Sequence, residues 1–591
     1  MPEVSEFSPM QQMIARTNTG LMTDNLMRLY QDVMEGALLC WLTEQNCPYL
    51  SPTKPSEQVV LHDNTTNASF ANRIYHRVIN LDKSLGSLGI RPLTSYEDRR
   101  TSKALHLSVM AFTAQWAQGS HRSRARYSSP TSPSDGQLSS GLEEEFDETV
   151  QQSFWNQARK ALDDCSEVNS FKLAFAELVF GLTQKRDARP ETSHAFGKVN
   201  DWRESRKQVT MRIQQAFESD GHNTYLERGA RRLHVLKRRV DSFERKTRSQ
   251  LAVRDDETAA TSTERRTMEL VFWLGVMFDT LSAAITERPV TVPDEESNKP
   301  KNLPIDTGNP SASCTPSQDW NDGFIIKRHQ KLAPLRWPCP TDAIARELRD
   351  AAPVKVLLFR KITRLQTLYN RGAGQPTIED AIQDALSVYR HWNMTYGPLF
   401  QDCLQHHTSL PAKVQSWYVC LLGHWLLAVM MLADAISLMD DQRLSLPREA
   451  CGRKAMDLVA HLRRTGSCMV SDLARVSVPR DNEEGRLSAY HDAVREGALL
   501  TEPWTMVLIR SFAMAGTVFL DLAADTGSQD EELLRETFER CESCVRALWY
   551  LGRKSSLSRQ VADILGESLR IERRYREGIG HGRLLGQIMA V

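Results

Sequence analysis

One continuous stretch, residues 264–296, constrains the fold of this chain most strongly. It reads ERRTMELVFWLGVMFDTLSAAITERPVTVPDEE, with an uninterrupted apolar run followed by Arg-Pro and an acidic segment. Large apolar residues recur at spacings of three and four, which is typical of a helix with a wide apolar face. These residues are Leu270, Trp273, Leu274, Met277, Phe278 and Leu281. Because proline lacks an N–H donor, Pro289 is expected to stop the helix, and the stretch predicts a buried helix over 264–287.

The ends of this helix and its one acidic residue lead to two further predictions. Thr261 or Ser262 is expected to cap the start by accepting a hydrogen bond from a backbone N–H of the first turn. Asp279 lies among apolar residues, and a buried carboxylate needs a partner. Arg288, near the negative end of the helix, or a helix N-terminus could supply that partner. The local interpretation is core packing.

The rest of the chain shows helical periodicity almost throughout, without the sustained alternation of a sheet. An all-α fold is therefore predicted. Thr94 and Glu97 have the spacing of a capping box at a helix start. The remaining predicted helices cover residues 24–45, 68–84, 95–118, 147–184, 225–252, 353–371, 377–396, 411–440, 447–464, 489–526, 530–552 and 556–576.

Two segments interrupt the helical pattern and suggest the organisation of the chain. Residues 119–143 are rich in Ser, Pro, Gly and Arg, and residues 290–322 contain several prolines with Asn, Ser and Asp. Such compositions bury too little apolar surface to offset the entropy of ordering. The first is predicted to be a flexible linker or loop, and the second a disordered loop between halves of one helical body. The intervening units are an N-terminal helical segment, a central helical region and a C-terminal helical region, covering 1–118, 144–289 and 323–591.

Charge and cysteine content exclude several classes of protein. Lysine plus arginine equals aspartate plus glutamate at 74 each, so the formal net charge is zero, which argues against a chain-wide nucleic-acid surface. The eleven cysteines are odd in number and irregularly spaced, as expected for reduced thiols in an intracellular protein. The first residues lack the pattern of a signal peptide. The apolar run at 417–433 is short for a membrane span and is predicted to be a buried helix.

A basic helix is predicted between Tyr225 and Leu251. It contains nine basic residues and three acidic ones, while apolar residues at helical spacing allow one face to pack. Three functional interpretations stay open: a nuclear-import signal at Lys237, Arg238 and Arg239, a phosphate-contacting surface, or a partner-binding helix. The structural alternative is an ordinary solvated helix face.

Motifs for metal binding or catalysis are weak. Cys541 and Cys544 form a C-x2-C pair, but they lie inside a predicted helix without a second pair nearby, where they would behave as small apolar residues. His424, in an apolar helix, is expected to be a hydrogen-bonded core histidine. The sequence has no P-loop, dinucleotide-binding glycine motif or nucleophile elbow. No catalytic, cofactor or metal residues are therefore predicted, and the protein is not expected to be an enzyme.

The 264–296 stretch resembles the middle homology region of fungal binuclear zinc-cluster transcription regulators. In that family basic residues precede a Trp-bearing helix, followed by Asp, Ser, Arg-Pro and acidic residues. The matching positions here are Arg265, Arg266, Trp273, Asp279, Ser282, Arg288, Pro289, Asp294 and Glu295. Further blocks are similar to the ethanol-regulator-like subgroup, and they occur in order along most of the chain, at 26–50, 70–86, 91–117, 389–407 and 414–436.

The resemblance implies an all-helical regulatory domain, a nuclear location and transcriptional control in a filamentous fungus. Arg266, Trp273, Asp279, Ser282, Arg288 and Pro289 are expected to have structural roles. The family reads DNA through six clustered cysteines, which this sequence lacks, so direct promoter recognition does not carry over. A missed upstream exon, a DNA-binding partner, or a diverged domain that senses a small molecule would each account for the difference.

The leading hypothesis is a pathway-specific nuclear transcription regulator that acts through a helical regulatory domain and has no zinc-cluster DNA reader of its own. Its expected partners are other transcription factors or coregulators, with indirect contact to DNA, a small-molecule inducer as a further ligand, and no membrane. The alternatives are a helical small-molecule-binding protein or enzyme that reuses the fold, and a scaffold for other regulators.

Overall fold

The protein is all-α, as predicted: in the part of the chain that the computed structural model describes, every regular element is a helix. The described residues are 23–50, 73–127, 136–184, 202–219, 224–250, 259–294, 322–327, 333–479, 497–526 and 530–588.

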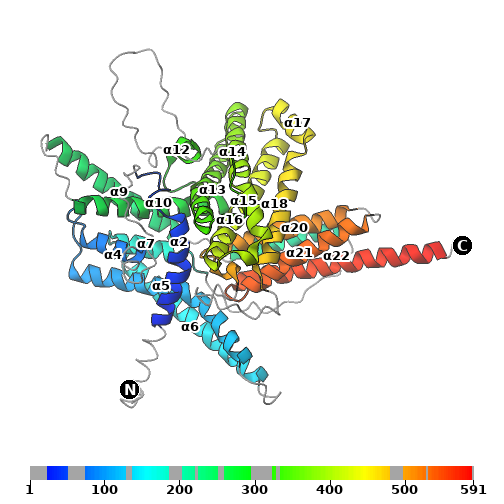
Figure 1. Ribbon diagram of the computed structural model, residues 1–591, viewed down its shortest axis with the longest axis horizontal. Coiled ribbons are helices and arrows are strands. Elements are labelled where there is room, and N and C mark those ends of the chain that lie inside the picture. The colour runs from blue at the N-terminus through cyan, green and yellow to red at the C-terminus, as the bar shows by residue number, and fades with distance from the viewer. Residues whose placement is uncertain are drawn as a thin grey trace, which may run out of the picture.

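The first group of helices forms one end of the body, in blue to green in Figure 1. Within this group α5 packs on α6 and α7, α7 packs on α9, and α9 packs on α10, while α4 contacts both α7 and α10. The elements are η1 (Gln31–Glu35), α2 (Gly36–Trp41), α4 (Ile74–Lys83), α5 (Ser95–Tyr127), α6 (Gly136–Asp164), α7 (Phe171–Phe180), α9 (Thr224–Gln250) and α10 (Ala259–Ile285).

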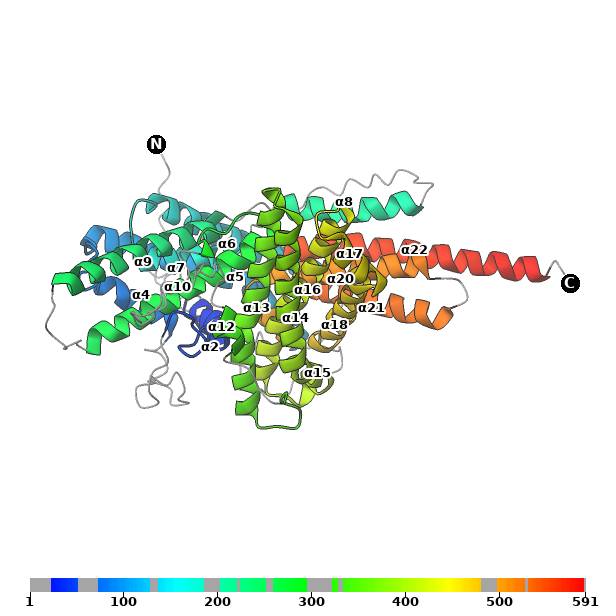
Figure 2. The ribbon, with the colours of Figure 1, turned by 90° about the horizontal axis from the view of Figure 1, so that it is seen from above.

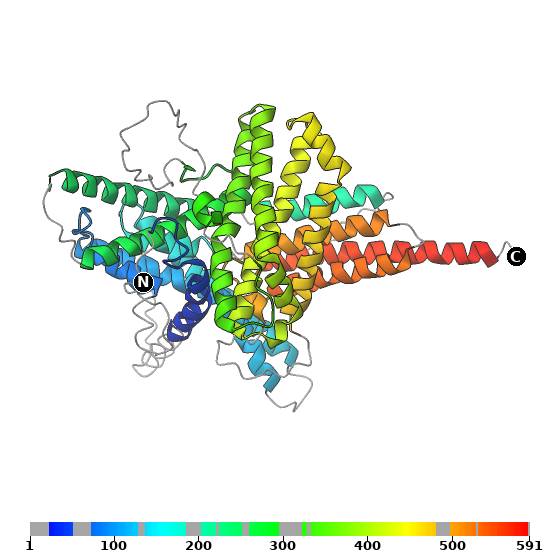
Figure 3. The same ribbon diagram turned by 45° about the horizontal axis from the view of Figure 1, so that its top comes forward.

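A second group stands upright beside the first, as Figure 3 shows in green and yellow. Helix α13 packs on α10, α14 and α16, and α16 packs in turn on α18. The elements are α12 (Asp322–Lys327), α13 (Thr341–Asn370), α14 (Gln375–Thr395), α15 (Gly397–Gln405), η3 (His407–Ser409), α16 (Ala412–Asp441), α17 (Pro447–Ala455) and α18 (Leu458–Ser477).

The last group, in orange and red, carries the C-terminus. It consists of η4 (Ala498–Thr501), α20 (Thr505–Asp525), α21 (Glu531–Leu551) and α22 (Ser556–Ile588). Helix α8 (Trp202–Ser219) precedes α9 in the sequence but lies beside α22 in Figure 2, and it contacts both α20 and α22. The chain therefore runs from the first group of helices to the last group at α8 and returns to the first group at α9. The helices of the second group follow later in the sequence.

Most predicted helices are present, with several differences in their limits. The pattern over 147–184 contains a break between α6 and α7, and 447–464 is divided between α17 and α18. The helix expected to begin at Pro353 begins at Thr341 and continues through that proline. Pro353 lies in a fully buried part of α13, where packing outweighs the loss of one backbone hydrogen bond. Helix α8 was not predicted.

Helical structure also extends into the segment predicted as a linker, 119–143. Helix α5 continues to Tyr127 and α6 begins at Gly136, leaving only 128–135 outside the described residues. In the second predicted loop, 290–322, the described residues 290–294 are held against the helices, and 322 begins α12. Helices therefore occupy much of the first predicted irregular segment, whereas residues 295–321 of the second lie outside the described residues.

Three helices are long and apolar enough to cross a membrane by length and composition, and they are segments of α10, α16 and α20. In the structure these segments are packed against other helices, with 94%, 83% and 61% of their most apolar windows buried. The run at 417–433 is thus a buried helix, as predicted. Long apolar helices of this kind supply the core because every turn can contact a neighbour.

Five ionisable side chains, all buried, meet where α13, α16 and the segments on either side of α20 and α21 come together. This Glu502 cluster contains Lys355 of α13, Cys420 and His424 of α16, Glu502 after η4, and Lys554 between α21 and α22. The Nε2 atom of His424 lies 3.1 Å from Oε1 of Glu502, and its Nδ1 lies 3.4 Å from Nζ of Lys355. The Nζ of Lys554 donates hydrogen bonds to the carbonyl oxygens of Leu500 and Glu502, at 3.0 and 2.8 Å.

Tryptophan rings from the first group of helices complete the surroundings of both lysines. The Nζ of Lys355 lies 4.2 Å from the ring centroid of Trp41 in α2, and that of Lys554 lies 4.3 Å from the ring of Trp116 in α5. A cation over an aromatic face is attracted by the ring quadrupole, more strongly when water is excluded. The indole N–H of Trp116 also donates to the carbonyl of Leu500, at 2.6 Å. The cluster therefore joins both ends of the chain.

Burial lowers the pKa of the three basic side chains of the cluster and opposes ionisation of its carboxyl group. Removal from water lowers the pKa of Lys355 to about 8 and that of Lys554 to about 7, and it also lowers the pKa of His424. For Glu502, burial opposes ionisation, but His424, the Trp504 backbone N–H and Cys420 outweigh it and lower the pKa of the carboxyl group. Glu502 is thus the negative charge that balances the buried amines.

We expect Glu502→Gln to reduce the free energy of unfolding by about 3–5 kcal/mol, because it leaves buried cationic groups without their carboxylate. Urea denaturation followed by circular dichroism measures the change. Glu532→Gln is the matched control, since Glu532 is 82% exposed and pairs with Arg535 on its own helix; this control should change stability little. Equal stability of the two variants would contradict the structural role of Glu502.

Candidate functional site

The family-like residues begin in α10, whose inner face is fully buried. Trp273 has no exposed surface, and its ring lies edge-on to Tyr49 with centroids 6.0 Å apart. The helix begins at Ala259, so the prediction of a cap at Thr261 or Ser262 is wrong, since both positions lie within the helix. The preceding residues extend the helix because nothing in them, neither proline nor glycine, terminates it earlier.

Asp279 is the centre of a compact polar cluster where α10 ends. Its side chain is completely buried, and its Oδ1 accepts hydrogen bonds from Nη2 of Arg288 and Oγ1 of Thr291, both at 2.8 Å. Its Oδ2 accepts from the backbone N–H groups of Thr291 and Val292, at 2.7 and 3.2 Å. Of the two partners expected for Asp279, Arg288 is the one present in the structure, and the carboxylate also holds the backbone that follows Pro289.

A second arginine fixes the same segment to α13. Arg360 is almost fully buried and donates from Nε to Asp294 at 2.7 Å and from Nη2 to the carbonyl of Val292 at 2.6 Å. Its Nη1 donates to Thr280 of α10 at 3.2 Å. Residues 289–294 are consequently held between α10 and α13. The Asp279 cluster, defined by Asp279, Arg288, Thr291 and Val292, thus acts with Arg360 to connect two groups of helices.

The other family-like residues also lie in structural surroundings. Ser282 is buried in α10, and its carbonyl accepts a hydrogen bond from the hydroxyl of Thr286 at 2.8 Å. Arg266 lies on the same helix, with Nη1 3.9 Å from a carboxylate oxygen of Glu44. The carbonyl of Pro289 accepts from Nη1 of Arg288 at 2.9 Å. Two of these contacts are local to the end of α10, and the third joins α10 to the segment that follows α2.

The basic helix, α9, uses its first cations to pack on α7. Nε of Arg232 donates to the fully buried Glu177 at 3.0 Å, and Nη2 of Arg228 lies 3.3 Å from the same carboxylate. Arg228 also donates to Asp163 of α6, at 3.0 Å. The two helices approach closely because Gly229 faces α7: an added Cβ atom would lie 2.9 Å from the carbonyl oxygen of Ala174. These arginines are therefore structural.

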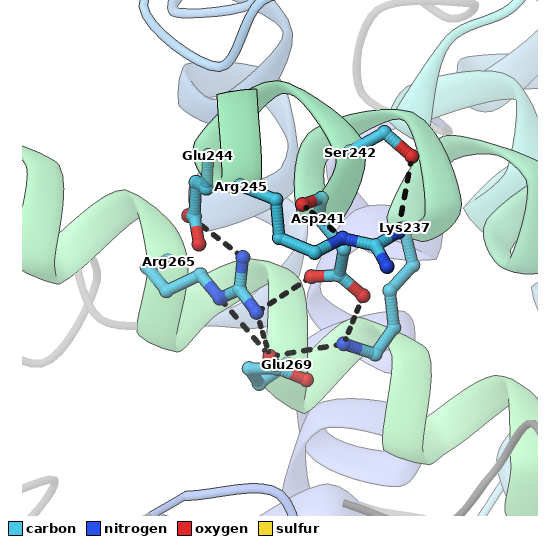
Figure 4. A network of polar contacts seen from close by, with 7 residues as sticks. All are labelled: Lys237, Asp241, Ser242, Glu244, Arg245, Arg265 and Glu269. Atoms are coloured by element: carbon cyan, nitrogen blue, oxygen red, sulfur yellow. Dashed lines mark hydrogen bonds and ion pairs between the residues drawn. The ribbon is translucent and has the colours of Figure 1, made fainter. Parts of the chain in front are cut away.

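Lys237, the first residue of the predicted import signal, points toward α10 rather than toward solvent. Figure 4 shows it in an ion-pair network that connects the two helices. Its Nζ lies 3.1 Å from Asp241 and 3.2 Å from Glu269, and 5.4 Å from the ring centroid of Phe272. Arg265 extends the network, with bonds of 2.7 Å to both Asp241 and Glu244. Lys237 therefore joins α9 to α10.

Arg238 and Arg239 lie on the opposite, solvent-exposed side of α9 and line a surface pocket of about 620 Å³. The structure thus separates the three residues of the predicted import signal. The pocket lies between α9 and the turn that follows α4. Its lining residues are Gly89, Ile90, Arg91, Val235, Arg238, Arg239, Ser242, Phe243 and Lys246. Sequence analysis identified the basic residues but not the pocket, because Gly89, Ile90 and Arg91 come from a distant segment.

The ring of Phe243 forms the contact between the two walls of this α9 pocket. It lies directly over Gly89, where an added Cβ atom would be only 2.1 Å from a ring carbon. Gly89 also has a φ of 70°, a conformation that residues with a Cβ rarely adopt. Glycine is therefore required here for both reasons, and the turn after α4 can lie close against α9.

The C-x2-C cysteines are buried and far less acidic than free thiols. The Sγ of Cys541 donates to the carbonyl of Gly516 at 3.6 Å, and burial raises its pKa to about 12 and also raises the pKa of Cys544. Among the described residues, no group of three His, Cys, Asp or Glu side chains converges as metal ligands would. The predicted role of His424 as a core histidine is confirmed by its place in the Glu502 cluster.

Comparisons with protein-family models, with curated proteins and with solved structures find no match to this chain. The functional argument therefore depends on the residues and their arrangement. The arrangement divides them into three sets: a buried cluster at Glu502, a connecting cluster at Asp279, and an exposed cationic pocket on α9.

We expect Asp279→Asn to lower the free energy of unfolding by about 2–4 kcal/mol, because a neutral amide cannot balance Arg288 or accept four hydrogen bonds. Chemical denaturation measures the loss. Asp163→Asn is the control, because Asp163 is half exposed and pairs with Arg228 on the surface, where such pairs contribute less than about 1 kcal/mol. A loss no larger than that of the control would show that the Asp279 cluster does not secure the body.

Proposed function

We propose that this protein is a nuclear transcription regulator of a filamentous fungus, which controls one pathway through its helical regulatory body. The observation that carries the proposal is the ordered series of sequence blocks that resemble fungal zinc-cluster regulators. The central block contains the Asp279 cluster, which joins α10 to the segment bound by Arg360. A regulator of this kind needs a connected body between its effector and partner surfaces.

The other family-like blocks support the proposal because they meet in the same body. The block at 26–50 forms η1 and α2, and the block at 414–436 lies in α16. These two are joined by a hydrogen bond from the indole N–H of Trp417 to the carbonyl of Gly36, at 2.9 Å. Blocks far apart in the sequence are therefore direct neighbours in space, as expected if they belong to one regulatory domain.

Contact with DNA is proposed to be indirect. The sequence has no cluster of six cysteines, and the described cysteines are free thiols spread over the body. Other transcription factors or coregulators would then bring the protein to promoters. A scaffold that only assembles such factors would use the same surfaces, but it would not change transcription when tethered to DNA by itself.

Fusion to a heterologous DNA-binding domain separates these functions. We expect the full chain, fused in this way in a fungal host, to change the output of a reporter gene by several-fold in at least one nutrient condition. The same fusion carrying Glu502→Gln is the control, because this change is expected to destabilise the helical body. It should lose the effect on the reporter. A folded, nuclear fusion that leaves the reporter unchanged in every condition would contradict the proposal.

Nuclear import is proposed to depend on Arg238 and Arg239, whose side chains are exposed, whereas Lys237 is held by Asp241 and Glu269. We expect Arg238→Ala with Arg239→Ala to reduce nuclear accumulation of a fluorescent fusion, since import receptors recognise accessible basic side chains. Arg231→Ala with Arg245→Ala is the control, because it removes two exposed cations of the same helix. Unchanged localisation of the first variant would exclude these residues as the import signal.

A second candidate function, that of a small-molecule-binding protein, is favoured by one observation, the α9 pocket. Its volume of about 620 Å³ is within the range of ligand sites, and its cations would select an anion. Saturable binding of a small organic anion to the purified protein, without turnover, would fit an inducer of the proposed regulator. Turnover of the bound compound would favour an enzyme.

A further inference from the structure

We propose that the α9 pocket binds an acidic segment of a partner protein, in which carboxylates alternate with apolar side chains. The pocket combines cations with exposed apolar surface: Phe243 is 41% exposed and Val235 is 37% exposed. Arginine and aromatic residues are the types that dominate binding energy at protein interfaces. The inference specifies the class of partner that the proposed regulator would bind. Its biological role rests on the proposed function, whereas the binding itself is tested independently of that function.

The arrangement of the residues along α9 fits an elongated ligand. Val235, Arg238, Arg239, Ser242, Phe243 and Lys246 follow spacings of three and four, so they form one stripe on the exposed face of the helix. At about 1.5 Å per residue, the stripe is roughly 16 Å long. Its cations are distributed along this length, which matches several separate carboxylates better than one compact anion.

Charge complementarity points to the acidic character of the partner. Four of the lining residues, Arg91, Arg238, Arg239 and Lys246, are cationic, and none of the lining residues in the described part of the chain is acidic. The chain as a whole has a formal net charge of zero, so this local excess of cations does not follow from the composition. The carboxylates of a partner would therefore be attracted to this stripe, while the exposed ring of Phe243 would contact an apolar side chain between them.

The surroundings of the pocket favour a peptide over a nucleic acid. Arg91 is paired with Glu97, and Glu264 lies beside the same turn, where it accepts a hydrogen bond from Ser87 at 2.8 Å. On its other side, α9 presents Asp241 and Glu244 in the network with Arg265. A duplex carries one charge per about 1.7 Å and would extend beyond the pocket onto these acidic residues, whereas a short segment would contact the cations alone.

Fluorescence anisotropy with the purified full chain tests the inference. The probe is a fluorescein-labelled peptide of fifteen residues made of glutamate and leucine. Its leucines recur at spacings of three and four, and glutamates lie between them. We expect saturable binding, weakened about tenfold or more by Arg238→Glu with Arg239→Glu and several-fold by Phe243→Ala. Arg231→Glu with Arg245→Glu changes the net charge of the same helix equally and should have a much smaller effect, because neither residue lines the pocket.

One variant should strengthen binding, which a loss of folding cannot do. Glu97→Gln removes the carboxylate that pairs with Arg91, while glutamine still serves in the capping box with Thr94. We expect about two- to fivefold tighter binding of the same peptide. Unchanged or weaker binding by this folded variant would contradict a role for Arg91 in the pocket.

Three control ligands complete the test. A peptide with glutamine in place of every glutamate, and one with serine in place of every leucine, should each bind at least about tenfold more weakly. Equal binding of the serine peptide would show general charge attraction and overturn the inference, as would absence of binding by the acidic peptide. Tighter, Arg238-dependent binding of duplex DNA would also overturn it. Because no reporter is involved, failure here leaves the proposed function to its own test.

Discussion

The rest of this structure depends on the interactions of one buried carboxylate, that of Glu502. Around it lie two buried lysines and a histidine from three different parts of the chain. Charged groups are costly to remove from water, and a buried charge is stabilised by opposite charges and hydrogen bonds around it. The partners of Glu502 come together only when α13, α16 and the turn before α22 are assembled. The cluster therefore couples the packing of distant helices.

The tryptophan rings extend this coupling to the first helices of the protein. Trp41 and Trp116 cover the two lysine amines, so the first group of helices is needed to complete the cluster formed by the later ones. The Asp279 cluster provides a second connection, through Arg360 of α13. With both connections internal, Asp279 and Arg288 make their polar contacts within the protein. The residues that we propose for binding lie elsewhere, on the exposed face of α9.

The sequence predicted the features that depend on local patterns. Helical periodicity located most elements, and the Thr94–Glu97 capping box is present with the expected reciprocal hydrogen bonds, at 2.8 and 3.2 Å. The Asp279–Arg288 pair was predictable because the two residues are only nine positions apart on a helix and the segment that follows it. Helix α8 was not predicted because its few apolar residues are separated by charged and polar ones. Its buried apolar residues do share one face, and they are Val209, Ile213, Ala216 and Phe217.

The candidate site was predictable only in part, because it combines distant segments. The basic residues of α9 are evident from composition, but their division into inward and outward cations depends on the positions of α7 and α10. Arg232 forms an ion pair with Glu177, and Lys237 forms one with Glu269. Neither carboxylate could be assigned as a partner from the spacing of residues in the sequence. The Glu502 cluster was equally hidden, since Lys355 and Lys554 are separated by most of the C-terminal region. Only the position of His424 in an apolar helix indicated buried polar contacts.

The central claim, that the helices form one body around the Glu502 cluster, is tested most directly by native-state hydrogen exchange of the full chain in increasing urea. The account predicts that the slowest amides of α10, α13 and α16 share one free energy of opening and one dependence on urea. Two separate openings, with the helices before residue 294 exchanging independently of those after residue 333, would contradict it.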